Sequence, residues 1–278
     1  RRLEAAWQRA GLDPLLIAHP THGPRIAFGN WVGGDRDGHP GVTAEVTRET
    51  LELLRTEALA LVDERLRQCA VSLSLSTEHQ ALPEALATRA RELTEQLGDR
   101  ALKAVARNAG EPWRQFVNLL RLSVAADAAD EEYPARPSTL LADLELLRSS
   151  LRAVGAERIA RSDVDPLLWL VATFGFHLAR LDVRQNSAFH DRALAQLMAT
   201  ADVEGAADYP AWEPARRRVL LDAELRTRRP FAASDDVEGD EARAVVGVYK
   251  HLAEHLRRVG PEGIGALIVS MTRSTEDL

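Results

Sequence analysis

The sequence predicts a strongly helix-rich α/β fold, and three observations lead to this prediction. Most of the 278 residues follow the apolar spacing of helices. Three short segments instead have strand character, at residues 26–31, 176–183 and 265–271. Long helical stretches separate them, so the strands are expected to pair in parallel through helical crossovers. Three strands cannot close a barrel, and the α/β part is therefore expected to be incomplete.

Helix start and stop signals divide the chain. Thr43 suits the N-cap of a long helix, and Gly98 closes a helix that begins near Pro83. Asp165 is a candidate N-cap followed by proline, and Ser187 is a candidate cap directly after the second strand. Further helices are predicted from about Pro112, at 138–154, and at about 214–226 and 240–259. Residues 201–212 and 230–240 are predicted to be exposed loops.

The strand segments differ in their patterns. In residues 176–183 the buried positions are expected to be Phe176, Leu178, Leu181 and Val183. Residues 265–271 form a continuous apolar run, which is typical of a strand buried on both faces. The first segment, residues 26–31, runs into a glycine-rich turn.

Composition excludes several classes of function. The chain is 45% hydrophobic and 28% charged, as in ordinary globular proteins. A net charge of −7 argues against bulk attraction to nucleic acid or acidic lipid. No apolar run approaches the roughly 20 residues of a membrane span. The single cysteine, Cys69, excludes an internal disulfide, fits a reducing cytosol and is interpreted as a small core residue.

The ends of the sequence suggest a piece of a longer protein. The chain opens with Arg1 rather than an initiator methionine, and it stops at Leu278 without a helix stop signal. Both ends are therefore expected to be cut. Residues 1–278 are expected to form a single partial domain.

The first candidate site is the turn-rich run from Trp31 to Pro40. Its paired glycines allow a sharp turn and a close approach of the main chain to a ligand. Arg36 lies between Asp35 and Asp37, so one aspartate could hold its guanidinium while the other faces solvent, metal or substrate. The alternative is a tight surface turn with a local Arg–Asp pair. Function is favoured by the position after a strand, where α/β folds build their sites.

The second candidate site is the end of the middle strand. Arg184 and Asn186 precede a helix N-terminus, and a guanidinium beside free N–H groups is typical of an anion site. The alternative is that Arg184 pairs with Asp182 or Asp191 and only orients the turn.

A third pattern, at residues 251–255, is His-Leu-Ala-Glu-His, which matches an inverted zinc-protease motif. Its histidines lie one helical turn apart and could clamp a metal. The alternative is a solvated helix end, where cationic groups suit the negative end of the helix dipole. Only Glu262 and Glu276 remain downstream as a third ligand, so the metalloprotease interpretation is the weaker one.

Two motifs resemble a known family. FGNWVGGDRDGHPGVT (28–43) is similar to the FxSWMGGDRDGNPxVT signature of phosphoenolpyruvate carboxylases, and FGFHLARLDVRQNSAFHDRAL (174–194) is similar to their FGLxLxxLDIRQxSxxHxxAL segment. GEPWR (110–114) resembles the family's GEPYR, and Val269-Ser270-Met271 resembles the end of its VISM strand. The matches follow the family's order over nearly the whole chain.

The resemblance implies a fold and a reaction. The fold would be a partial (β/α)8 TIM-type barrel with large additional helical layers, and the three strands would belong to the barrel. The reaction would join bicarbonate to phosphoenolpyruvate, giving oxaloacetate and phosphate, with Mg²⁺ or Mn²⁺ as cofactor. Bicarbonate would attack the phosphoryl group, and the enolate would capture the carbon dioxide released from carboxyphosphate. Such chemistry needs positive charge at the phosphate and exclusion of water.

The resemblance also implies roles for five residues. Arg184 would bind the substrate's phosphate, and Trp31 would wall the pocket for bicarbonate and carbon dioxide. Arg36, with Asp35 and Asp37, would shape the catalytic loop at the barrel mouth. His39 stands where the family usually has asparagine, which is a mild departure because neutral imidazole also has one donor and one acceptor.

Other parts of the family's machinery are absent from this sequence. The upstream histidine segment, the metal-binding carboxylates, the mobile glycine-rich loop and the aspartate-inhibition site are expected to lie outside it. The parent is expected to be a cytoplasmic homotetramer that replenishes the tricarboxylic acid cycle, and the fragment alone to be inactive. The competing hypothesis is a non-enzymatic helical interaction module that keeps the signature.

Overall fold

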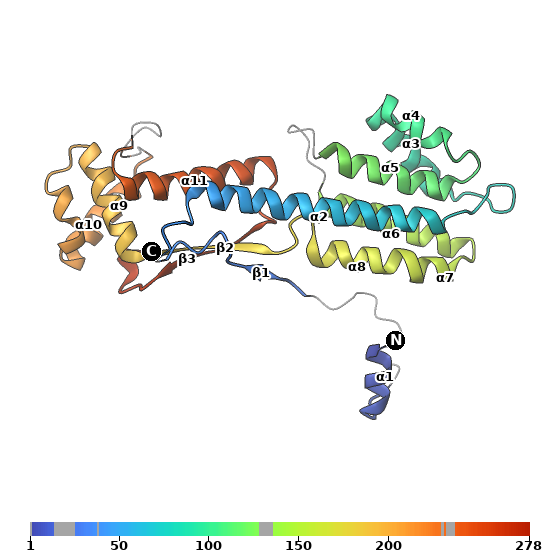
Figure 1. Cartoon of the computed structure of the whole chain (residues 1–278), viewed down its shortest axis with the longest axis horizontal. Coiled ribbons are helices and arrows are strands. Elements are labelled where there is room, and N and C mark those ends of the chain that lie inside the picture. The colour runs from blue at the N-terminus through green and yellow to red at the C-terminus, as the bar shows by residue number, and fades with distance from the viewer. Residues whose placement is uncertain (1, 14–25, 38, 128–135, 229–230, 232–236) are drawn as a thin grey trace.

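The computed structural model describes residues 2–13, 26–37, 39–127, 136–228, 231 and 237–278. The molecule is elongated, with a helical bundle at one end and a small sheet covered by helices at the other (Figure 1). The helices are α1 (Arg2–Arg9), α2 (Ala44–Ser72), α3 (Glu84–Leu97), α4 (Asp99–Ala106), α5 (Pro112–Asp127), α6 (Pro137–Ala153), α7 (Glu157–Ile159), α8 (Asp165–Phe174), α9 (Ser187–Thr200), α10 (Pro214–Glu224) and α11 (Asp240–Arg258). The strands are β1 (Gly29–Asn30), β2 (Arg180–Asn186) and β3 (Ile264–Ser270), with short helical segments at η2 (Ala160–Val164), η3 (Ala206–Ala211) and η4 (Thr275–Asp277).

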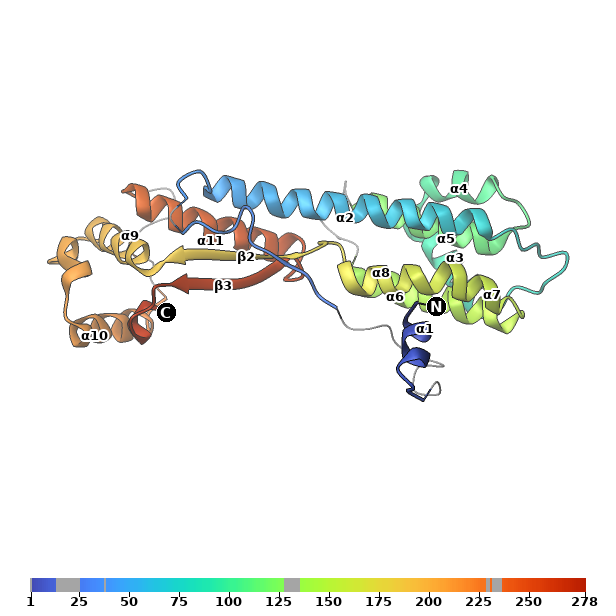
Figure 2. The ribbon, with the colours of Figure 1, turned by 60° about the horizontal axis from the view of Figure 1, so that its bottom comes forward.

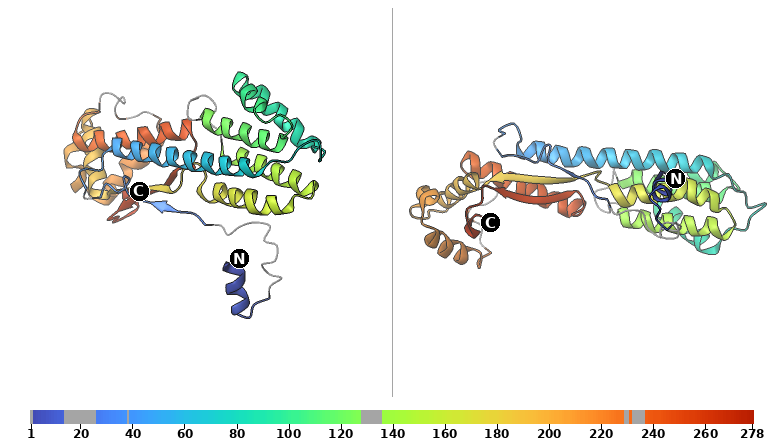
Figure 3. Two further views of the ribbon diagram at one scale, coloured as in Figure 1. Left: turned by 45° about the vertical axis from the view of Figure 1, so that its right-hand side comes forward. Right: turned by 90° about the horizontal axis from the view of Figure 1, so that it is seen from below.

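Helix α2 connects the two ends of the molecule. Its 29 residues give it a length of about 43 Å. The predicted cap is confirmed, because the Thr43 side chain accepts a hydrogen bond from the Val46 N–H. Figure 3 shows α2 running from the sheet into the bundle formed by α3 to α8. The two halves of one helix therefore contribute to two different hydrophobic clusters.

The bundle has the larger of these clusters. Its buried side chains come from every long helix at that end and include Leu66, Leu86, Leu119, Leu147 and Leu168. Trp113 is completely buried there, and its Nε1 donates to the Ser150 Oγ at 2.9 Å, so the polar end of the indole is satisfied. Cys69 lies in the same core at 3% exposure, which confirms its predicted structural place.

The sheet is parallel, as predicted, in the order β1-β2-β3. Its side chains alternate along β2: Leu181 and Val183 are buried, while Arg180 and Arg184 belong to the opposite face. The buried face packs against Leu51 of α2 and Leu252 of α11. Figure 2 shows both helices on that same face of β2 and β3.

The predicted strand boundaries need correction. The strand expected at 176–183 begins only at Arg180, because Leu178 has a φ of 56° and interrupts the extended backbone. Phe176 is buried as expected, but in the bundle core. The strand expected at 26–31 is reduced to Gly29–Asn30.

The apolar run at 265–271 does form a strand, but its predicted burial on both faces is wrong within this chain. Leu267 is 53% exposed and Ile268 is 39% exposed, because β3 pairs only with β2 and lies at the edge of the sheet.

Several predicted caps and loops also differ. Asp165 is not the predicted N-cap: it is already the first residue of α8, because η2 leads directly into that helix. Asn186, rather than Ser187, caps α9, and its side chain accepts from the Ala188 N–H. The loop expected at 201–212 contains η3, and most of the loop expected at 230–240 lies outside the described residues. In the described part of the chain, no helix combines the length and apolar character needed to cross a membrane.

Candidate anion site at the strand ends

The chain after β1 continues alongside β2 beyond the two residues of the strand itself. The Arg184 N–H donates to the Gly34 carbonyl and the Arg36 N–H donates to the Arg184 carbonyl, both at 2.9 Å. A Cβ on Gly34 would lie only 2.1 Å from the Asp182 carbonyl oxygen, so this position needs glycine. The glycines thus permit close approach of one backbone to another, which fixes the turn against β2.

The turn is also fastened to the start of α2. Gly33 has a φ of 85°, a conformation that suits glycine. Its carbonyl accepts from the Thr47 hydroxyl at 2.9 Å, which anchors the turn to the first turn of α2. Within the turn, the Asp37 N–H donates to the Asp35 carboxylate at 3.1 Å. The two predicted aspartates are therefore held in a fixed relation.

The loop after β1 meets the ends of β2 and β3 at the Asp37 carboxylate. Its Oδ2 accepts from the Ser270 hydroxyl at 2.6 Å and from Nη2 of Arg184 at 2.9 Å. Its Oδ1 accepts from the Asn186 amide at 3.4 Å. Nη1 of Arg184 lies 3.7 Å from Asp35. Groups from the loop after β1, from β2 and from β3 thus form one polar cluster, at the strand edge where α/β folds build their sites.

The environment of Asp37 favours its charged form. The hydrogen bond from Ser270 is the largest influence on its pKa and lowers it. Burial comes next and raises the pKa, and the contacts from Asn186 and Arg184 lower it again, so the pKa lies below its usual value. Asp37 is therefore a carboxylate at neutral pH, and it occupies one side of the Arg184 guanidinium. The Nε of Arg184 is buried and has no hydrogen-bond partner within the described residues.

Arg36 does not make the predicted pair with Asp35 or Asp37. It is buried, at 8% exposure, on the other side of the turn, and its Nε donates to the Val42 carbonyl at 3.3 Å. Burial lowers its pKa, opposed by Tyr249. Alternation along the extended chain explains the difference, because it places the two aspartates on one face and Arg36 on the other.

Arg184 likewise has partners that the sequence alternatives did not name. It binds Asp37 and Asp35 rather than Asp182 or Asp191. The Asp182 carboxylate instead accepts from the Ala266 N–H of β3 at 2.8 Å. The ion pair is formed across the fold rather than within one turn.

Trp31 lies at the beginning of the same turn, with its indole 68% exposed. Its carbonyl accepts from the N–H groups of Gly34 and Asp35, both at 2.9 Å. His39 follows the aspartates, and its Nδ1 accepts from the Gly41 N–H at 3.2 Å. The structure thus brings Asp35, Asp37 and Arg184 together, with Trp31 at the start of the turn that carries both aspartates, while Arg36 is buried on the other side of that turn.

The described residues do not fit a divalent cation. They contain no group of three or more histidine, cysteine, aspartate or glutamate side chains placed to hold a metal. Asp35 and Asp37 both face Arg184, so a metal would compete with a guanidinium for them. In this structure the two carboxylates at this edge are engaged by the guanidinium of Arg184.

A second charged cluster, which the sequence patterns did not reveal, joins the segment after β3 to α9 and α10. The buried Arg217 donates to both oxygens of the buried Asp191, at 3.1 and 3.0 Å. Arg273 donates to Asp191 at 2.6 Å and to Asp277 at 2.7 Å. Only the abundance of arginine and aspartate in these segments could have suggested it, because the partners are far apart in sequence.

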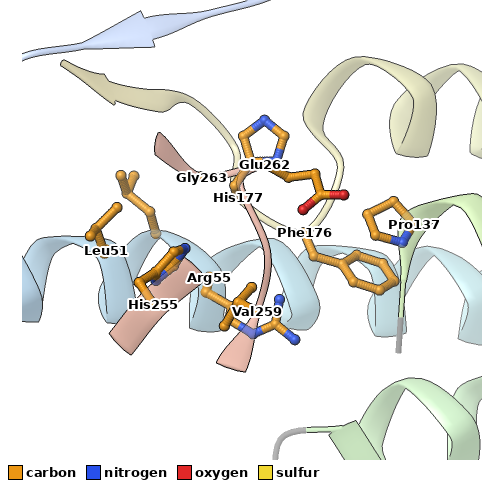
Figure 4. Close-up of a pocket in the computed structure, with 10 residues that line it drawn as sticks. Leu51, Arg55, Pro137, Phe176, His177, His255, Val259, Glu262 and Gly263 are labelled. Carbon is orange, nitrogen blue, oxygen red and sulfur yellow. The ribbon is translucent and has the colours of Figure 1, made fainter. Parts of the chain in front are cut away.

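A separate pocket lies at the opposite ends of the strands (Figure 4). It is lined by His177 before β2, Glu262 and Gly263 before β3, and His255 near the end of α11. Burial is the main cause that lowers the pKa of each histidine. Two ring nitrogens lack hydrogen-bond partners in the described residues: Nδ1 of His177, which lies beside Gly175, and Nε2 of His255, which lies beside Gly263. A Cβ on Gly175 would lie 2.7 Å from the first, and one on Gly263 would lie 3.1 Å from the second.

The same geometry gives no support to a zinc protease. His251 lies 3.5 Å from Glu45 of α2, whereas His255 packs beside Gly263. The described residues provide no third ligand beside them.

Comparison with known proteins decides the family. The sequence profile described as phosphoenolpyruvate carboxylase matches residues 2–278. The chain belongs to the phosphoenolpyruvate carboxylase family. It is 35% identical over 268 residues to a phosphoenolpyruvate carboxylase of Mycolicibacterium paratuberculosis, covering 92% of this chain and 27% of that protein.

Two other relatives with the same name give similar values. The protein of Rhodopseudomonas palustris is 37% identical over 265 residues, covering 91% of this chain and 28% of that protein. The protein of Nocardia farcinica is 34% identical over 291 residues, covering 99% of this chain and 30% of that protein. The chain thus spans less than a third of the length of these phosphoenolpyruvate carboxylases.

Proposed function

We propose that this chain is part of an enzyme that carboxylates phosphoenolpyruvate with bicarbonate, giving oxaloacetate and phosphate. Family membership supports this, since the relatives are named for that activity. The observation that carries it to particular residues is the polar cluster around Arg184, where the loop after β1 meets the carboxyl ends of β2 and β3. A partial (β/α)8 barrel is proposed as the wider setting, with the face that carries Arg180 and Arg184 turned toward the lumen.

Arg184 is proposed to bind the phosphate of the substrate. Its guanidinium is held at the strand ends rather than free in solvent, so less side-chain entropy is lost when an anion binds. Nη2 of Arg184 is already engaged by Asp37, whereas Nη1 lies 3.7 Å from the Asp35 carboxylate and is bound less closely. The anion would therefore approach Nη1. Trp31 is proposed to cover this edge, where its indole would limit hydration of carbon dioxide.

The local charge indicates that this site is not complete by itself. Arg184 supplies one positive charge, while Asp35 and Asp37 supply two negative charges. A dianionic phosphate is repelled by such a cluster unless further cations join it. Those cations, and the ligands for Mg²⁺ or Mn²⁺, are proposed to lie in the remainder of the parent protein, as are the contacts of a homotetramer. A cytoplasmic, anaplerotic role is part of the same proposal.

The test is oxaloacetate formation by the purified full-length protein, coupled to NADH oxidation by malate dehydrogenase. Phosphoenolpyruvate- and bicarbonate-dependent turnover is the expected result. The 278 residues alone are expected to give none. Absence of turnover by a folded full-length protein, with divalent cation present, would instead favour the interaction module.

A further inference from the structure

The Oδ2 atom of Asp37 accepts from a second donor besides Arg184. Ser270, the last residue of β3, donates its hydroxyl to this oxygen at 2.6 Å, the shortest of the contacts made by the carboxylate. Arg184 donates to the same Oδ2 at 2.9 Å. Both bonds therefore depend on one orientation of the carboxylate.

We propose that Ser270 is a positioning residue for anion binding: its hydroxyl holds Asp37, and Asp37 holds the guanidinium of Arg184. The proposal rests on the anion-binding role proposed above for Arg184. Ser270 itself does not reach the anion in this assignment and acts only through Asp37.

The conformational freedom of each side chain indicates which residue positions which. The Arg184 side chain is 43% exposed and has several rotatable bonds, so it needs an external constraint to keep one position. The Asp37 side chain is only 18% exposed and short, and it receives donors from β2 and β3 at once. Ser270 sits on the sheet, in register with Asn186, the other donor to Asp37. The most rigid partner is thus the serine, and the most mobile is the arginine.

Loss of the serine hydroxyl has a specific consequence. The Ser270 bond is the largest of the influences that keep the pKa of Asp37 low. Without it, Oδ2 keeps only the guanidinium, and the longer 3.4 Å contact from Asn186 to Oδ1 holds the carboxylate less firmly. Arg184 then samples more positions, and binding of the anion has to restrict it. The entropy lost by restricting Arg184 opposes binding of the substrate more than the chemical step. KM should therefore change more than kcat.

The experiment compares Ser270→Ala with Ser270→Thr in the full-length enzyme. Ser270→Ala is expected to raise KM for phosphoenolpyruvate roughly tenfold, equivalent to about 1.4 kcal/mol, with a smaller change in kcat. Ser270→Thr keeps a hydroxyl on the same Cβ and is expected to restore most of the wild-type KM. Ser123→Ala is the matched control, since it removes a hydroxyl that donates to the Leu120 carbonyl inside α5, far from the strand ends.

The outcomes separate this inference from the proposed function. If Arg184→Ala raises KM but Ser270→Ala does not, the positioning role of Ser270 is wrong and the role of Arg184 stands. If Ser270→Ala raises KM and Ser270→Thr fails to restore it, packing rather than the hydroxyl is responsible, and the positioning role of the Ser270 hydroxyl is again wrong. If Arg184→Ala itself leaves KM unchanged, the proposed function of that residue fails first. A double variant, Ser270→Ala with Asp37→Asn, should differ from Asp37→Asn alone by less than about twofold, because both changes break one chain of contacts.

Discussion

The Nη2 of Arg184 lies 2.9 Å from the Oδ2 of Asp37, a residue 147 positions earlier in the chain. The pair joins the loop after β1 to β2, and it is formed at the edge where β2 and β3 end. An arginine in a local turn could be replaced with little effect. Arg184 instead pairs with a residue that is distant in sequence, in the turn that carries the family motif, so its substitution should have a larger effect.

Arg184→Ala in the full-length enzyme is therefore expected to raise KM for phosphoenolpyruvate by about 10- to 100-fold, since charge-assisted hydrogen bonds contribute about 1.5–3 kcal/mol. Steady-state kinetics at saturating bicarbonate measures the change. Arg180→Ala is the matched control, because it removes a guanidinium from the same face at the other end of β2. Equal effects of the two substitutions would mean that general positive charge, rather than this position, matters.

The position of Arg184 could be predicted from the sequence, but its partners could not. A strand end before a helix N-terminus is a local pattern, and it indicates the correct edge of the sheet. The choice of Asp37 over Asp182 depends on which residues the parallel pairing of β1 and β2 brings together. The contact of Ser270 with Asp37 was missed for the same reason: the serine was noted only as part of a family motif, and nothing local in the sequence indicates its partner.

Errors in the strands have a related cause. The prediction that β3 is buried on both faces rests on its apolar residues, but burial also depends on neighbouring elements, and within the described residues β3 pairs only with β2. The start of β2 was misplaced because the left-handed backbone at Leu178 is unusual for leucine and has no sequence signature. By contrast, Thr43 and Gly98 mark helix ends correctly, since capping is decided within a few residues.

Gly34→Ala is expected to disrupt the turn that carries Asp35 and Asp37. The new Cβ would lie 2.1 Å from the backbone oxygen of Asp182, so one of two paired backbones must move. A loss of about 3 kcal/mol or more in stability, or failure to fold, is expected. Thermal unfolding and soluble yield of the full-length protein report it.

Gly29→Ala provides the comparison for this substitution in the same segment. Its added Cβ would have no neighbour closer than 3.8 Å, at the Asp182 carboxylate. A change within about 0.5–1 kcal/mol is expected. Similar losses for the two variants would show that close approach at Gly34 is not what makes glycine necessary there.

Cys69 is expected to be unreactive in the folded protein. It is 3% exposed in the bundle core, and burial raises the pKa of its thiol to about 12. The thiolate, which is the reactive form, is therefore scarce at about pH 8. Peptide mass spectrometry after treatment with a disulfide reagent should show Cys69 unmodified in native protein and modified after denaturation. Rapid labelling under native conditions would mean that the bundle opens locally.

Asp277 is expected to stabilise the segment after β3 in a pH-dependent way. The hydrogen bonds from Arg273 are the main cause that lowers its pKa to about 2, below the value of about 3.9 for an unfolded chain. A depressed folded-state pKa contributes stability that is fully present above about pH 4 and is lost as the pH falls toward about 2. Asp277→Asn in the full-length protein should therefore cost about 1.5–3 kcal/mol at about pH 7.

The measurement for Asp277 is denaturant unfolding of wild type and variant between about pH 7 and the lowest pH at which unfolding is reversible. The difference in unfolding free energy should shrink as the pH falls below about 4. Asp208→Asn makes the same change of charge at an exposed position in η3 and should have little effect at any pH. A difference that stays constant down to low pH would assign the role of Asp277 to shape and hydrogen bonding, because loss of the carboxylate charge by protonation would then leave its contribution intact.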